Sequence, residues 1–186
     1  MFRNWLKRLT QSHRCRRKHY AFQSFTTEVM EVRQLLAANI FVATSGNDGA
    51  GRGTLDAPYA TLGRALAAAD SGDTVILRNG TYAGNVRVED TNVTIRSFEN
   101  EWAVISTPIN DVNQRWGIRF SPTASGGRLQ RVEVQGGYFY GVMIASEWGE
   151  VPAERVAAKG VLIEDCRIHS TAFLRRPGAV FPCRIE

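Results

Sequence analysis

The sequence predicts an all-β protein, a parallel β-helix in which about four coils of short strands stack on one another. Two observations carry this prediction. From residue 40 onward the chain consists of short β-branched runs separated by Gly, Asn, Asp and Ser, which is the pattern of short strands joined by turns. Some of these runs also recur at fixed spacings, and such recurrence is typical of solenoids.

Nine runs are expected to form the strands, and most of them are four to six residues long. They cover residues 40–45, 74–79, 85–89, 92–98, 103–107, 117–121, 129–135, 141–146 and 161–170. We expect their inward Val, Ile and Leu side chains to stack on those of the next coil.

The first spacing is 24 residues. Trp116–Ser121 align with Tyr140–Ala145 at this offset, and Val93 precedes Gly117 by the same interval. A β-sandwich also predicts short alternating strands, but it does not predict a return every 24 residues. The spacing therefore favours stacked coils.

A second, looser spacing is 34 residues. Val132 and Val134 align with Cys166 and Ile168 at this offset. The ten additional residues fall on the polar segment 147–157, which we interpret as a loop inserted between coils. Alternation then places Cys166 and Ile168 inside the stack.

One helix is expected before the coils, over residues 58–69. Thr61 is suited to cap its start, and Gly72 lies just past its end. Its apolar positions follow helical spacing and are Leu62, Ala65, Leu66 and Ala69.

The net charge of +5 at first suggests a nucleic-acid partner. Residues 1–39, however, hold eight of the 23 basic residues and two of the 18 acidic ones, so the rest of the chain has 15 basic and 16 acidic residues. Basicity confined to one terminal segment is typical of targeting signals as well as binding arms. We therefore expect no nucleic-acid partner, and the sequence has no apolar run of the roughly 18 residues that span a membrane.

Residues 1–39 are interpreted as a basic leader that is flexible or cleaved. Met30, Glu31, Arg33 and the run 35–38 (LLAA) resemble the N-terminal export signal of large bacterial surface and secreted proteins. The resemblance implies a secreted or cell-surface bacterial protein. The alternative is a short amphipathic helix that docks on the body.

The start of the body resembles the right-handed parallel β-helix proteins of the pectate-lyase-like superfamily. The motifs that carry the resemblance are Gly46-x-Asp48, Gly53-Thr54, Pro58-Tyr59, Thr61-Leu62, the run 72–75 (GDTV) and the run 79–82 (NGTY). The match is strong over residues 40–106, and the pattern of short β-branched runs continues to residue 170. It implies a right-handed β-helix whose N-terminal end is covered by the helix.

The same resemblance implies an enzyme that cleaves acidic polysaccharides, commonly with a bound calcium ion and an Arg or Lys base. Calcium prefers oxygen ligands, so Asp48 and Asp165 are its candidates, with Asn47 and Asp56 beside Asp48. Turn chemistry explains the residues of the Gly-rich loop equally well.

Two residues near the end of the stack are candidates for substrate binding, Arg167 and His169. Alternation places both on the outer face, together with Asp165 and beside Glu133 and Gln135 of the preceding coil. The alternative is that Glu133 and Arg167 form a salt bridge without a binding role.

Exposed aromatic side chains stack on sugar rings. Tyr138, Tyr140 and Trp148 border the loops between coils, where solenoids place binding surfaces. They complete the candidate set, although packing at a corner of a coil would also account for them. Trp102 and Trp116 belong to the same aromatic group.

The three cysteines, Cys15, Cys166 and Cys183, have no CxxC spacing, which argues against a zinc ribbon and a disulfide framework. Cys166 lies in an apolar alternation and is expected to be a buried small residue.

Four regions follow: the leader (1–39), an N-terminal strand and capping helix (40–73), the coils (74–170) and an irregular tail (171–186). The tail loses the coil rhythm, so we expect either an incomplete, truncated or frameshifted enzyme or a tail that folds back as a cap. The predicted protein is a monomer that acts on a polysaccharide or cell-surface glycan and lacks a complete active site. A non-catalytic adhesion or glycan-binding scaffold is the alternative.

Overall fold

The computed structural model describes residues 37–144 and 157–170. This part of the chain contains twelve strands and one short helix. The helix is α1 (Leu62–Leu66), and the strands are β1 (Asn39–Val42), β2 (Thr74–Leu77), β3 (Gly80–Ala83), β4 (Val86–Val88), β5 (Thr94–Ser97), β6 (Ala103–Thr107), β7 (Trp116–Phe120), β8 (Arg128–Gln130), β9 (Val132–Gly136), β10 (Tyr140–Ile144), β11 (Leu162–Glu164) and β12 (Arg167–His169). The described residues are therefore mostly β with almost no helix.

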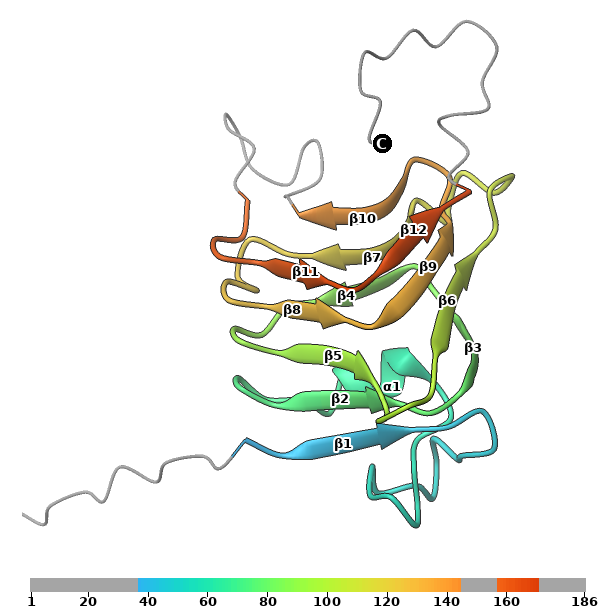
Figure 1. Cartoon of the computed structure of the whole chain (residues 1–186), viewed down its shortest axis with the longest axis vertical. Coiled ribbons are helices and arrows are strands. Elements are labelled where there is room, and N and C mark those ends of the chain that lie inside the picture. Colours follow the sequence, from blue (N-terminus) through green and yellow to red (C-terminus); the bar gives the residue numbers. More distant parts are fainter. Residues whose placement is uncertain (1–36, 145–156, 171–186) are drawn as a thin grey trace, which may run out of the picture. The chain divides into compact units, whose positions relative to one another are not determined.

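The strands form three sheets, and all nine pairings between them are parallel. The strand orders are β1-β2-β5-β8-β11, β10-β7-β4 and β12-β9-β6-β3. The chain visits the sheets in a constant order, through β2, β3 and β4, then β5, β6 and β7, then β8, β9 and β10 (Figure 1). This arrangement is consistent with a parallel β-helix.

Both predicted spacings appear as strand pairings. Tyr140 pairs with Trp116 across the 24-residue spacing, and Ile168 pairs with Val134 across the 34-residue spacing. The match of Val93 with Gly117 was wrong, because β5 pairs with β2 and β8 whereas Gly117 lies in another sheet.

Two runs that we expected as single strands are each divided. The run 129–135 turns at Arg131 (φ 53°), between β8 and β9, and the run 161–170 turns at Asp165 (φ 50°), between β11 and β12. Each corner lies inside a continuous run with the pattern of a strand, and Arg seldom adopts left-handed backbone, so the corners were missed. The strand β3 was also missed.

The core consists of rows of apolar side chains that follow the strand register. One row contains Val75, Ile95 and Leu129, which are fully buried and belong to consecutive strands of one sheet. Burial of one such side chain stabilises the fold by about 1.5–3 kcal/mol. Stacked rows of this kind therefore account for much of the stability of the sheets.

Helix α1 is shorter than the predicted 58–69 segment. Tyr59 is extended instead of helical: its N–H donates to the Phe41 carbonyl, and its carbonyl accepts from the Ala43 N–H. Thr61 is the N-cap, as predicted, and its hydroxyl accepts from the Arg64 N–H at 3.2 Å. The helix packs against β1, β2 and β4.

The turns that lead into the five-stranded sheet share one conformation. Gly72, Asn92, Gly126 and Gly160 all have left-handed φ values between 57° and 93°, and each lies two residues before a strand of this sheet. A Cβ atom on Gly126 would lie 2.1 Å from Asn92 Oδ1. The turns therefore lie in contact with one another, and a side chain at Gly126 would have to displace that of Asn92.

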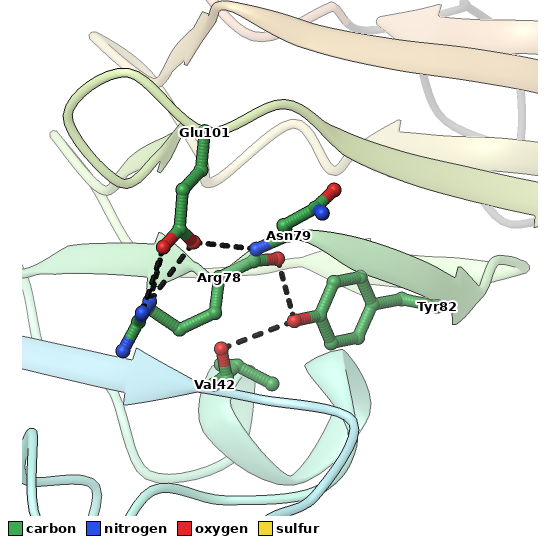
Figure 2. Close-up of polar contacts among 5 residues, drawn as sticks. All are labelled: Val42, Arg78, Asn79, Tyr82 and Glu101. Carbon is green, nitrogen blue, oxygen red and sulfur yellow. Dashed lines mark hydrogen bonds and ion pairs between the residues drawn. The ribbon is translucent and has the colours of Figure 1, made fainter.

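A polar network joins the corners of two successive coils (Figure 2). Both carboxylate oxygens of Glu101 accept from Arg78 Nε at 2.9 Å, and one of them accepts from the Asn79 N–H at 2.6 Å. The Tyr82 hydroxyl is within hydrogen-bond distance of the Arg78 carbonyl (2.8 Å) and the Val42 carbonyl (3.1 Å). The network thus connects β1 with the corners after β2 and β5.

Several predictions lie outside the described residues. These include residues 1–36 of the leader, Trp148, most of the loop 147–157 and the tail 171–186. Within the described chain, β1 begins at Asn39, one residue before the predicted boundary. The described residues form no helix with the length and apolar character needed to span a membrane.

Candidate functional site

The candidate site lies on the sheet β12-β9-β6-β3. Strand register places Val104, Glu133 and Arg167 in one row, and Ser106, Gln135 and His169 in a second row. Alternation points both rows away from the core, because the intervening Ile105 and Val134 are completely buried.

Glu133 connects the two predicted binding residues. Its Oε1 lies 3.1 Å from His169 Nε2, and its Oε2 lies 3.8 Å from Arg167 Nη1. The Glu133 side chain is 19% exposed, whereas that of Arg167 is 71% exposed. The carboxylate is therefore held at the sheet surface, while most of the Arg167 side chain is exposed. The ion pair that alternation predicted between Glu133 and Arg167 is present.

Two further residues complete what we call the Glu133 cluster, defined as Trp102, Glu133, Arg167, His169 and Ser170. The Arg167 guanidinium carbon lies 4.9 Å from the centroid of the Trp102 ring, a cation–π arrangement. His169 Nδ1 lies 2.8 Å from Ser170 Oγ. Both nitrogens of the imidazole therefore have polar partners.

Tyr138 and Tyr140 belong to a different group, at the turn between β9 and β10. The Tyr138 ring meets the Phe139 ring edge-on at 4.7 Å, and the Phe139 and Tyr140 rings are 6.1 Å apart. Tyr140 is 39% exposed. These aromatic side chains pack on one another, as the alternative interpretation allowed.

Asp48 supports the start of the helix. Its Oδ1 accepts from the backbone N–H groups of Ala60 and Thr61, and its Oδ2 accepts from the Thr61 hydroxyl at 2.6 Å. The hydrogen bond from the Thr61 hydroxyl is the main cause that lowers the pKa of Asp48 below its usual value. Asn47 closes its own turn by accepting from the N–H groups of Gly49 and Ala50.

Asp165 is a corner residue and not an outward strand residue, because the backbone turns there with φ 50°. Calcium requires about six to eight oxygen ligands. Within residues 37–144 and 157–170, no group of three or more His, Cys, Asp or Glu side chains is placed to hold a metal ion. Asp48 and Asp165 therefore belong to no such group among the described residues, and the calcium site stays a prediction.

The interior positions that we expected at the last two strands are only partly enclosed. Cys166 is a free, half-buried thiol whose pKa is raised by desolvation. Ile168 lies beside Val134 in the register but is 44% exposed. The reason is that β12 is the edge strand of its sheet.

Sequence reasoning missed Trp102 and Ser170 as members of the cluster. Ser170 directly follows His169, so its contact with the imidazole had a local signal. Trp102 precedes β6, and its contact with Arg167 joins residues 65 positions apart. No repeat spacing pointed to that contact.

No protein-family model matches this chain. Over 78 residues the chain is 35% identical to a pectate lyase of Emericella nidulans, and the match covers 38% of this chain and 19% of that enzyme. Among solved structures, a rhamnogalacturonan lyase matches 71% of this chain and 51% of its own, with a TM-score of 0.38 and 12% sequence identity. The sequence match supports a scaffold like that of polysaccharide lyases.

Proposed function

We propose that this chain is part of an exported, monomeric, right-handed parallel β-helix protein that acts on acidic polysaccharides at the Glu133 cluster. The observation that carries the proposal is the position of Glu133 between Arg167 and His169, on the outer face of a sheet. The stretch of 35% identity to a pectate lyase gives the substrate class. Export rests on the resemblance of residues 30–38 to bacterial signals. In the same proposal, α1 caps the first coil.

Arg167 is the group that binds the substrate carboxylate. A guanidinium group binds carboxylates through paired N–H donors. The Arg167 side chain is 71% exposed and lies 3.8 Å from Glu133, so this loose ion pair leaves donors available to a uronate. Contact with the Trp102 ring holds the guanidinium over the sheet surface.

His169 is the group that accepts a proton. Cleavage of a uronate polymer by elimination begins with removal of the proton next to the carboxyl group, and imidazole accepts protons at neutral pH. The Glu133 carboxylate, 3.1 Å from Nε2, orients the ring and stabilises the positive charge that forms. The cluster thus combines a carboxylate-binding cation with a base.

The test is an ultraviolet assay of polygalacturonate incubated with the protein and calcium, because elimination creates an absorbing unsaturated product. We expect His169→Gln to reduce the initial rate by about 100-fold, within the usual contribution of a general base. Arg52→Ala, which removes an exposed positive charge elsewhere, should leave the rate unchanged. Absence of product from the unmodified protein would refute the lyase activity.

The alternative function is a non-catalytic glycan-binding scaffold. Tyr140, which is 39% exposed beside Phe139 at a turn between coils, offers a surface for stacking on sugars. Affinity electrophoresis in gels that contain polygalacturonate separates the two functions. Retarded migration without unsaturated product would establish the scaffold, and retardation with product would establish the lyase.

A further inference from the structure

Ser170, His169 and Glu133 lie in series on the outer face of β12 and β9. Ser170 Oγ is 2.8 Å from His169 Nδ1, and His169 Nε2 is 3.1 Å from Glu133 Oε1. A hydroxyl, an imidazole and a carboxylate in this order are the groups that activate a serine nucleophile. Glu133 lies in β9 and His169 in β12, which are paired strands, and Ser170 directly follows β12.

The partners of the imidazole determine where its proton lies when the ring is neutral. An ionised carboxylate only accepts hydrogen bonds, so His169 Nε2 must carry the proton that points to Glu133. His169 Nδ1 then has a free lone pair and accepts from the Ser170 hydroxyl. The imidazole is therefore oriented to remove the proton of Ser170.

The backbone at Ser170 is also unusual. Its φ of 60° lies in the left-handed region, which residues other than Gly, Asn and Asp seldom adopt. Gly136 follows Gln135 at the equivalent place one coil earlier and has φ 84°. An exposed serine therefore occupies a place suited to glycine, and a strained backbone also carries the nucleophile of many serine hydrolases.

We propose that Ser170, His169 and Glu133 form a nucleophile, base and carboxylate relay that hydrolyses esters carried by an acidic polysaccharide. The relay itself does not depend on the lyase reaction. The choice of an acidic polysaccharide rests on the proposed function, because it relies on Arg167 binding a neighbouring carboxylate. A small aryl ester therefore tests the chemistry separately from the substrate.

The reaction has two halves. Ser170 Oγ attacks the ester carbonyl carbon while its proton passes to His169 Nδ1, and the bond from carbon to the alcohol oxygen then breaks. The departing alcohol takes the proton from His169, which leaves an acyl group on Ser170. Water attacks this acyl group, gives a proton to His169 Nδ1 and releases the acid, and that proton returns to Ser170 Oγ.

The first experiment uses the full chain and a fluorophosphonate probe, which forms a P–O bond to an activated serine and releases fluoride. We expect peptide mass spectrometry to find the adduct on Ser170. His169→Gln should reduce the labelling rate by about 100-fold because the base is lost. Failure to label Ser170 in the folded protein would overturn the proposal.

The second experiment measures hydrolysis of an aryl acetate. Ser170→Gly removes the hydroxyl while suiting the left-handed backbone, so the variant should keep its fold and lose at least about 100-fold in rate. Ser71→Ala removes another exposed serine, one that accepts from the Thr91 hydroxyl, and should hydrolyse the ester at the unmodified rate. Equal rates for Ser170→Gly and the unmodified protein would overturn the proposal. Ester hydrolysis without unsaturated uronate product would support the relay and refute only the lyase.

Discussion

Glu101 and Glu133 each contact an arginine from a neighbouring coil, and each arginine lies over an aromatic ring, but the two ion pairs differ in geometry. Glu101 binds Arg78 through both oxygens at 2.7–2.9 Å and also accepts from a backbone N–H. Glu133 approaches Arg167 only to 3.8 Å and shares its other oxygen with His169.

Exposure divides the two arginines in the same way but not the two glutamates, whose side chains are 26% exposed at Glu101 and 19% exposed at Glu133. The side chain of Arg78, which binds Glu101, is 38% exposed, whereas that of Arg167, beside Glu133, is 71% exposed. Close charge-assisted contacts fix a geometry, whereas a loose pair at an exposed site contributes little to stability. The comparison teaches that the Arg78–Glu101 pair supports the fold and that the Glu133 cluster is available for chemistry.

The largest expected difference between the two regions is in stability. Tyr82 is 3% exposed and reaches the Arg78 carbonyl, so Tyr82→Ala should lower the free energy of unfolding by about 3–5 kcal/mol through the cavity it leaves. His169→Ala, at an exposed position, should change it by about 0.5 kcal/mol or less. Urea denaturation measures both. If His169→Ala lowered the free energy of unfolding as much as Tyr82→Ala, the Glu133 cluster would be structural as well.

The next largest expected difference is in how the two glutamates contribute to stability at acid pH. Hydrogen bonds from Arg78 are the main cause that lowers the pKa of Glu101 below its ordinary 4.5. A lowered pKa in the folded state adds stability above the unfolded pKa, and this stability is lost as the pH falls through the folded pKa. The urea concentration at the unfolding midpoint of the unmodified protein should therefore decrease as the pH is lowered below about 4.5.

The matched variants isolate this effect. Glu101→Gln should be less stable at neutral pH and should lose less on acidification than the unmodified protein. Glu133→Gln leaves the contacts between Arg78 and Glu101 in place, so it serves as the matched control. The acid-dependent decline that remains in Glu101→Gln includes that of Asp48, whose pKa is also lowered. Identical acid profiles for Glu101→Gln and the unmodified protein would contradict the role given to Arg78.

Alkaline pH should change stability less, and only through Tyr82, which belongs to the network around Arg78 and Glu101. Burial is the main cause that raises the pKa of Tyr82 from 10.0 to about 12. The contribution of Tyr82 to stability is complete below pH 10 and is lost as the pH rises through about 12. Tyrosinate absorbance should show one late-titrating group that is absent from Tyr82→Phe. If the titration curve of Tyr82→Phe kept the same late step as that of the unmodified protein, Tyr82 would not be held as described.

The sequence predicted much of the pairing between stacked strands, but it did not predict the turns that divide two of the runs into separate strands. Inward Val, Ile and Leu recur along the chain, so the 24- and 34-residue spacings identified real strand pairs. The corners at Arg131 and Asp165 were hidden because each lies inside a run of residues that has the pattern of one continuous strand.

The candidate site was predicted in the same uneven way. Register alone brought Arg167 and His169 beside Glu133. By contrast, the three hydrogen bonds that engage the Asp48 carboxylate join it to residues at least 12 positions away. No local pattern distinguishes such a carboxylate from a metal ligand.

The most direct test of the division between the two clusters compares Arg78→Ala with Arg167→Ala in two measurements, the urea midpoint and the retardation in gels containing polygalacturonate. We predict that Arg78→Ala lowers the midpoint and keeps the retardation. Arg167→Ala should keep the midpoint and weaken glycan affinity by about tenfold or more, the expected loss of a charged hydrogen bond. Unchanged retardation of Arg167→Ala, with a lowered midpoint, would show that the Glu133 cluster is structural and would contradict this account.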